Sequence, residues 1–244
     1  MYFVEKLYRP VSLSEALDIL AEHPQAWPLA GGTDVLVKMR HQRLRGVELL
    51  SLLKIAELRG IEKLDNGDIA IGAMSTFTKI AESALIGAEV PMLKTAALSM
   101  GGPQIQNVAT IGGNICNGAT SADSAPSLFA LDALLELHSP GGVRLVPITQ
   151  FYAGPGQVKK APGELLKRII LPIGQKRDWA GVYIKMSTRK AMDIAILGSA
   201  AVCQLAADGR VEKAAIALGV AGPTPIRCQA AEALLNGAKV TEEL

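Results

Sequence analysis

The amino-terminal segment carries one clearly amphipathic stretch. Ser12 and Glu15 form a capping-box pattern, which predicts the start of a helix that ends at His23 and Pro24. The apolar face of this helix has the i, i+3, i+4, i+7 spacing and consists of Leu13, Ala16, Leu17 and Leu20. The apolar run at residues 2–8, closed by a proline, predicts a strand before the helix.

A second unit follows in the same segment. Residues 27–30 form a short apolar run that predicts a strand, and this strand leads directly into Gly31 and Gly32. Thr33 and Asp34 are residues that cap helices, so we expect a helix over 35–41 and then another strand over 47–50. The unit is therefore a strand, a glycine turn and a helix start.

From residue 61 the pattern changes to hairpins and short helices. The expected elements are a hairpin over 61–73, helices over 76–83, 91–100 and 121–131, a hairpin over 134–146, a strand over 181–186, an apolar run over 194–205, a strand over 211–219 and a helix over 229–235. This mixture predicts an α+β fold in three parts, which cover 1–59, 60–175 and 176–244.

Residues 104–118 do not fit a regular element. The segment is poor in charge for an exposed loop and rich in glycine and asparagine for a core helix or strand. We expect it to be an irregular loop whose backbone is wrapped against another group.

The composition narrows the range of possible functions. The 244 residues are 49% hydrophobic and 4% aromatic, with a formal net charge of +2, so the chain can form a core but has little attraction for nucleic acid. Cys116, Cys203 and Cys228 are too few for a disulfide framework or a four-cysteine cluster, and three scattered histidines indicate no metal site. A redox centre would then be an organic cofactor or belong to another chain. With no apolar window long enough for a membrane span, we expect a cytoplasmic protein.

Two glycine pairs are the strongest candidates for a binding site. Residues 30–34 read Ala-Gly-Gly-Thr-Asp, and residues 110–114 read Thr-Ile-Gly-Gly-Asn. Tandem glycines allow backbone amides to converge on an anion such as a diphosphate, although each pair can also be only a tight turn. The chain has neither the G-x-G-x-x-G nor the P-loop pattern, so a Rossmann or P-loop site has no support.

These motifs resemble the FAD-binding subunit of the molybdenum hydroxylases, the family of xanthine dehydrogenase and aerobic carbon monoxide dehydrogenase. The resemblance rests on residues 29–34, residues 107–115 with Asp123, residues 183–185 and residues 189–194, and it covers nearly the whole chain in order. It implies a fold of the type seen in vanillyl-alcohol oxidase (PCMH type), with FAD between the first two parts and a small carboxy-terminal α+β subdomain over the flavin.

The resemblance also implies which residues bind the cofactor. The two glycine loops would hold the diphosphate through their amides and through the side chains of Thr33 and Asn114. Asp123 would accept a hydrogen bond from a ribose hydroxyl, Tyr183 would cover the flavin ring, and Lys185 would place a cation near its pyrimidine edge. The full set is Leu29, Ala30, Gly31, Gly32, Thr33, Asp34, Met100, Gly101, Ile105, Thr110, Ile111, Gly112, Gly113, Asn114, Asn117, Asp123, Leu166, Tyr183 and Lys185.

Several of these side chains have a plainer interpretation. Tyr183 can equally be a packing aromatic, and Lys185 can be a solvated strand residue. The basic run from Lys38 to Arg45 is typical of a solvated face, and Cys116 of a thiol used for packing.

As to function, the resemblance implies an electron-transfer subunit. FAD would take electrons from a partner [2Fe-2S] subunit and pass them to NAD+, oxygen or a quinone, while a separate molybdenum-cofactor subunit oxidises the substrate. No side chain of this chain would act as a catalytic residue or metal ligand, and an apolar docking surface should exist. The alternatives are an assembly protein of the same fold without flavin and a stand-alone flavin reductase. Members of the family continue beyond the last residues here, so we expect a short member or a truncated piece.

Overall fold

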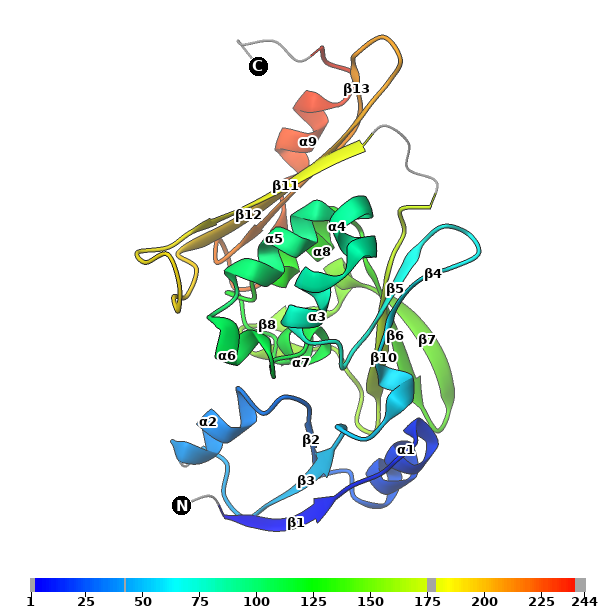
Figure 1. The fold of residues 1–244 in the computed structure, drawn as a ribbon, viewed down its shortest axis with the longest axis vertical. Helices are drawn as coiled ribbons and strands as arrows, with labels where there is room; N and C mark the ends of the chain where they lie inside the picture. Colours follow the sequence, from blue (N-terminus) through cyan, green and yellow to red (C-terminus); the bar gives the residue numbers. More distant parts are fainter. Residues whose placement is uncertain (1–2, 42, 175–178, 240–244) are drawn as a thin grey trace.

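The chain folds into three successive mixtures of strands and helices, each built around its own sheet (Figure 1). The computed structural model describes residues 3–41, 43–174 and 179–239. The part with the large helical core lies between the amino-terminal sheet and the carboxy-terminal sheet. The fold is therefore mixed α+β, as the sequence pattern predicts.

The first sheet is parallel and has the order β1-β3-β2. Its elements are β1 (Val4–Tyr8), α1 (Leu13–Glu22), β2 (Trp27–Leu29), α2 (Val35–Arg40) and β3 (Val47–Ser51). The Ser12 side chain accepts from the Glu15 amide, as a capping box requires, but the Glu15 carboxylate accepts from the Val11 amide at 2.7 Å. The apolar face of α1 packs in a small core with β3, and this core also includes Leu165 from the middle sheet.

The middle sheet is antiparallel, with the order β4-β5-β10-β6-β7. Its region contains η1 (Ala56–Leu58), β4 (Ile61–Lys63), β5 (Ile69–Gly72), α3 (Phe77–Glu82), α4 (Ala84–Glu89), α5 (Pro91–Ser99), α6 (Pro103–Gln106), α7 (Ile111–Cys116), α8 (Ser124–Ala130), β6 (Leu134–Ser139), β7 (Gly142–Pro147), η2 (Ile148–Gln150), β8 (Tyr152–Gly154), β9 (Gln157–Val158) and β10 (Leu165–Leu171). Side chains from these helices and from the sheet form the large hydrophobic core. Burial of this apolar surface is the main driving force for folding.

The third sheet is an antiparallel meander with the order β11-β12-β13-β14. It is formed by β11 (Trp179–Met186), β12 (Leu197–Leu205), β13 (Val211–Gly219) and β14 (Ile226–Arg227), and α9 (Gln229–Leu235) follows. Tyr183, Ala200 and Val202 point into the large core. Arg227 donates to the Phe129 carbonyl and pairs with Asp132, so this sheet is tied to the end of α8.

The structure differs from the expected elements at two important places. The segment 104–118 is not an irregular loop, because it contains α6 and α7. Thr110 caps α7 by accepting from the Gly113 amide at 3.1 Å, and this side-chain bond offsets the low helix propensity of two glycines. Strand β10 was not anticipated either, because a run buried on both faces has no alternating pattern.

No helix within the described residues is both long and apolar enough to cross a membrane.

The ion pair between Glu164 and Arg144 leads to a prediction on acid stability. Arg144 donates to both Glu164 carboxylate oxygens at 2.6 and 2.8 Å, and the Ala161 amide donates at 2.6 Å, so the pKa of Glu164 is lowered. Glu164→Gln should lower the free energy of unfolding at pH 7 by about 1–3 kcal/mol. A lowered carboxyl pKa stabilises the fold above the unfolded value of about 4.3, and this contribution is lost as the pH falls below it.

The measurement is urea unfolding of both proteins at pH 7 and pH 3.5. The difference between wild type and Glu164→Gln should shrink at the lower pH. A difference that is the same at both pH values would show that the carboxylate charge does not stabilise the fold.

Candidate functional site

The two glycine loops lie directly against each other. A Cβ on Gly31 would be 1.8 Å from the Val108 carbonyl oxygen, and a Cβ on Gly113 would be 3.6 Å from the Ala30 Cβ. Figure 1 shows α2, which follows the first loop, on the side of the amino-terminal part that faces α6 and α7. The predicted meeting of the two loops is therefore confirmed, and it requires glycine at position 31.

The amides of the first loop are available to a ligand. Within the described ranges, the backbone N–H groups of Gly31, Gly32, Thr33 and Asp34 donate to no protein acceptor. Gly32 has φ +78°, a conformation that favours glycine, and Gly31, Gly32 and Thr33 are half-buried. Unpaired amides in a half-buried turn fit an anionic group such as a phosphate. The first loop fits the diphosphate of the expected cofactor.

The amides of the second loop are used inside the fold. Ile111 donates to the Ser75 carbonyl at 3.0 Å, Gly112 to the Ala73 carbonyl at 2.9 Å, and Gly113 to the Thr110 hydroxyl. The prediction that the amides at both bends bind the diphosphate is therefore wrong for the second bend. The glycine pair there is the first turn of α7, and it is packed closely, because a Cβ on Gly112 would be 2.7 Å from the Ala73 carbonyl oxygen. A substitution at Gly112 would disturb packing before it reached a ligand.

Side chains connect the two loops. The Asn117 amide donates to Asp34 Oδ1 at 3.0 Å, and the Lys38 ammonium donates to Asn117 Oδ1 at 2.9 Å. Asp34 stands at the cap position of α2 but makes no side-chain capping bond, contrary to the prediction from sequence. Its carboxylate instead fixes Asn117, which follows α7. Asn114 accepts from the Ser124 hydroxyl at 2.7 Å, which orients its amide at the start of α8.

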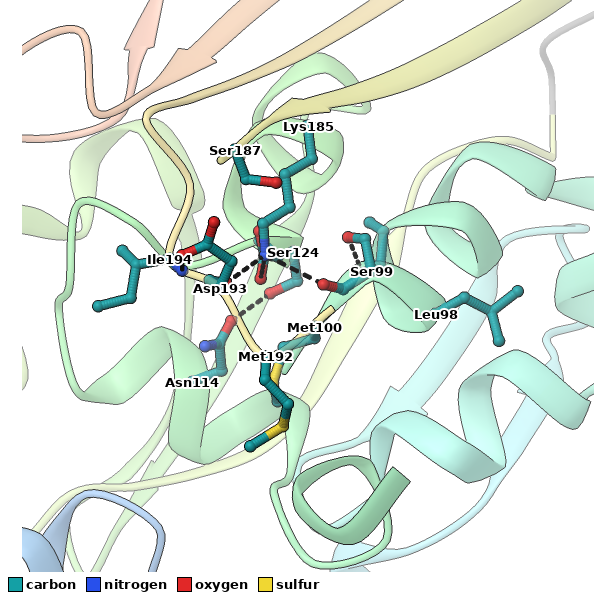
Figure 2. Close-up of polar contacts among 12 residues, drawn as sticks. Leu98, Ser99, Met100, Asn114, Ser124, Lys185, Ser187, Met192, Asp193 and Ile194 are labelled. Carbon is teal, nitrogen blue, oxygen red and sulfur yellow. Dashed lines mark hydrogen bonds and ion pairs between the residues drawn. The ribbon is translucent and has the colours of Figure 1, made fainter. Parts of the chain in front are cut away.

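A second group of predicted residues consists of Asp123, Tyr183 and Lys185, and Figure 2 shows Lys185 of this group beside Ser99 and Asp193. The Tyr183 hydroxyl donates to Asp123 Oδ1 at 3.0 Å, and the Lys185 ammonium donates to Asp123 Oδ2 at 3.0 Å. Lys185 also donates to the carbonyls of Ser99 and Asp193 at 3.0 and 2.9 Å. These three bonds use all three hydrogens of the ammonium group.

This arrangement decides between the interpretations of Tyr183 and Lys185. Tyr183 is 4% exposed, so it is a packing aromatic here, and burial together with the Asp123 charge raises its pKa. Burial also raises the pKa of Asp123, while the bonds from Lys185 and Tyr183 oppose that rise. Lys185 is neither solvated nor a free cation, because it is paired with a buried carboxylate. Any effect of Lys185 on a bound flavin would therefore come from the Lys185–Asp123 ion pair and not from Lys185 alone.

The remaining predicted residues divide into two groups. Met100, Gly101 and Ile105 lie together where α5 turns into α6, and the Gly101 carbonyl accepts from the Met192 amide at 2.9 Å. Met100 and Ile105 are half-buried and pack against the large core, and Met100 directly follows Ser99, whose carbonyl accepts from Lys185. Leu166 is 5% exposed within the large core on β10, away from any open surface. Its contact with a cofactor stays a prediction.

The segment between β11 and β12 forms a cavity that the sequence motifs did not reveal. Its volume is about 360 Å³, and it is lined by Ser99, Lys185, Ser187, Thr188, Arg189, Lys190, Ala191 and Asp193. Asp193 holds this segment through the Thr188 hydroxyl and the amides of Arg189 and Ile194, and these bonds lower its pKa. Residues 189–194 are part of the sequence stretch that resembles the family. That Asp193 accepts these hydrogen bonds, however, could be recognised only from the folded structure.

Cys116 gives a chemical test of the site. Burial raises the pKa of its thiol from the ordinary value of 9.0 to about 11. At pH 8 a rise of two units lowers the reactive thiolate fraction roughly 100-fold. We therefore expect Cys116 to react with iodoacetamide about 100-fold more slowly than a free thiol, as measured by mass spectrometry of tryptic peptides over time. Labelling at the rate of free cysteine would contradict its packing role.

Comparison with known proteins identifies relatives along the whole chain. Residues 3–174 match the family described as "FAD binding domain in molybdopterin dehydrogenase", and residues 182–244 match "CO dehydrogenase flavoprotein C-terminal domain". The xanthine dehydrogenase FAD-binding subunit of Escherichia coli O157:H7 is 46% identical over 232 residues, which are 95% of this chain and 79% of that protein. The carbon monoxide dehydrogenase medium chain of Afipia carboxidovorans is 31% identical over 94% of this chain and 79% of its own length.

Solved structures show the same fold. A chain of the Cu,Mo-CO dehydrogenase in its cyanide-inactivated form superposes with a TM-score of 0.93 at 30% identity, over 100% of this chain and 84% of that chain. A chain of quinoline 2-oxidoreductase from Pseudomonas putida 86 gives a TM-score of 0.90 at 26% identity, over 100% of this chain and 83% of that chain.

Proposed function

This chain belongs to the FAD-binding subunits of the molybdenum hydroxylases, and from that premise we propose that it carries electrons from a partner [2Fe-2S] subunit to a small acceptor. It is an oxidoreductase subunit and its cofactor is FAD. The contact of the two loops, with the first-loop amides unbonded, is the observation that supports the position of the cofactor.

The residues of this chain would bind and orient the cofactor. FAD, when bound, supplies a redox centre that accepts and releases electrons in steps that no side chain can perform. The amides of the first loop would hold the diphosphate, and Thr33 and Asn114 would add side-chain hydrogen bonds at the same place. The flavin would extend toward Met100 and the cavity at Lys185, and Asp123, which is bonded to Lys185, would offer its carboxylate to a ribityl hydroxyl. Leu29, Ala30, Ile105 and Leu166 would supply apolar contacts.

Two observations support a partner chain. The three cysteines are free, and they fall short of the four ligands that a [2Fe-2S] cluster needs. Strand β11, at the edge of its sheet, leaves Val182, Ile184 and Met186 50–57% exposed, and this apolar surface would suit docking of a partner. The partners proposed are an iron–sulfur subunit and a molybdenum-cofactor subunit in one hetero-oligomer, with NAD+, oxygen or a quinone as acceptor. The complex would work in the cytoplasm.

The three parts would divide these tasks. Residues 1–59 and 60–175 would enclose FAD, and residues 176–244 would cover the flavin from the side of β11 and the cavity.

The decisive experiment is purification of the native complex with metal analysis. Iron and molybdenum should travel with this chain, and the complex should show the absorption of FAD. The isolated chain should be yellow and should be reduced by NADH slowly, whereas a reduced iron–sulfur subunit should reduce it rapidly. A colourless chain that cannot be reconstituted with FAD would favour the assembly protein, and fast reduction by NADH without a partner would favour a flavin reductase.

A further inference from the structure

Trp27 is an exposed aromatic residue at the edge of the cofactor site. It lies on β2, two residues before the end of the strand, and it is 39% exposed in a chain that is only 4% aromatic. Large aromatic side chains normally contribute to a core, because each buries a large apolar area. An indole left open beside a binding loop therefore suggests a ligand surface.

The surroundings of Trp27 link it to the two loops. The Lys38 ammonium lies 5.8 Å from the centroid of the indole ring, within the range of a cation–π contact. The same ammonium donates to Asn117, and Asn117 donates to Asp34 of the first loop. Trp27, Lys38 and Asn117 thus form one wall that continues from the first loop toward the end of α7.

The distance along β2 suits one end of a dinucleotide. A strand rises about 3.3 Å per residue, so Trp27 lies about 7 Å along the strand from Leu29, where the diphosphate loop begins. The flavin end would point to the cavity at Lys185 on β11, which is on the other side of α7 from β2 (Figure 1). The adenosine end then extends toward Trp27.

We propose that Trp27 is the stacking surface for the adenine ring of FAD, and that Lys38, held by Asn117, positions the indole for this contact. The proposal rests on the FAD site described above and adds to it the residue that recognises the adenine half. The indole gives stacking and apolar contact, whereas the unbonded amides of the first loop give the anion contact. Trp27 would therefore affect the affinity for adenine nucleotides.

The test uses the apo-chain and three variants at one position. Trp27→Ala and Trp27→Leu should both weaken FAD binding by roughly 5- to 100-fold, the range for loss of a base–aromatic stack. Trp27→Phe should bind FAD within a few-fold of wild type, because phenylalanine keeps an aromatic face. Dissociation constants are measured by calorimetry, so the result does not depend on enzymatic activity. Trp179→Phe, which changes the second of the two tryptophans, is the matched control and should bind FAD normally.

Fluorescence gives a second measurement. In Trp179→Phe the emission comes from Trp27 alone, and ADP at concentrations that displace FAD should quench it. Four results would each overturn the proposal: Trp27→Ala that binds FAD like wild type, Trp27→Phe as weak as Trp27→Leu, ADP that leaves the emission unchanged, or ADP that fails to displace FAD. Failure of the wild-type chain to bind FAD at all would instead contradict the cofactor assignment.

Discussion

Gly31→Ala is expected to abolish the tight binding of FAD. The new Cβ would be 1.8 Å from the Val108 carbonyl oxygen, and this oxygen belongs to the backbone and cannot rotate away, so the two loops must move apart. Forcing a methyl group into a packed contact costs about 1–3 kcal/mol, and here that cost applies to the arrangement that binds FAD. We expect the affinity for FAD to fall about 5- to 150-fold, as measured by calorimetry of the apo-chain, with circular dichroism unchanged.

Gly87→Ala is the matched control for this variant. Gly87 lies in α4, and a Cβ there would come no closer than 3.8 Å to Lys94, so alanine fits. Replacing a helical glycine by alanine should stabilise the fold by about 0.5–1 kcal/mol and leave the FAD affinity unchanged. If Gly31→Ala kept the wild-type affinity, close contact between the loops would not be needed for binding.

Lys185→Met should produce the largest loss of stability. The change leaves the Asp123 carboxylate buried at 7% exposure without its cation, and breaking a buried ion pair in this way costs about 3–5 kcal/mol. For a chain of this size each kcal/mol lowers Tm by about 2–4 °C, so a decrease of roughly 6–20 °C is expected. Differential scanning fluorimetry of the two proteins measures it.

The pH dependence of this loss has a definite sign. Without Lys185 the folded pKa of Asp123 rises further above its unfolded value of about 3.9, so ionisation favours the unfolded chain as the pH increases above that value. The destabilisation should therefore be larger at pH 7 than at pH 4. Urea unfolding of wild type and Lys185→Met at both pH values measures it.

Two further variants test whether the pair is responsible. Lys185→Met combined with Asp123→Asn should recover part of the loss, because the unpaired charge is removed. Lys190→Met, at an exposed position next to the same cavity, should leave Tm within about 1 °C, as surface substitutions usually do. Equal losses in Lys185→Met and Lys190→Met would show that the hairpin as a whole, rather than the ion pair, stabilises the protein.

Local patterns predicted most of the regular elements. The helices at 13–22 and 229–235 and the strand at 211–219 follow from apolar spacing and from capping or turn residues, which act within a few residues of the chain. Elements were missed where a long-range contact outweighs propensity. Helix α7 contains two glycines, and it is held by Thr110 and by the Ala73 and Ser75 carbonyls from a distant segment.

The candidate site was predicted less completely than the fold. The motifs correctly brought together the two glycine loops, but they assigned the same role to both. Whether an amide is free depends on the acceptors that the fold places near it, and these come from residues far away in sequence. Lys185 is a second example. Its ammonium group donates to Ser99, Asp123 and Asp193, and motif reading could not foresee these three acceptors.

The sequence by itself determined the class of fold, the family and the positions of the two loops, because spacing, capping and motif order are local properties that a chain carries without folding. Only the tertiary structure decided which loop keeps its amides for a ligand, that Tyr183 and Lys185 bind Asp123, and that Trp27 stands open beside Lys38. Hydrogen bonding and burial depend on neighbours that are distant along the chain, so no local pattern can specify them.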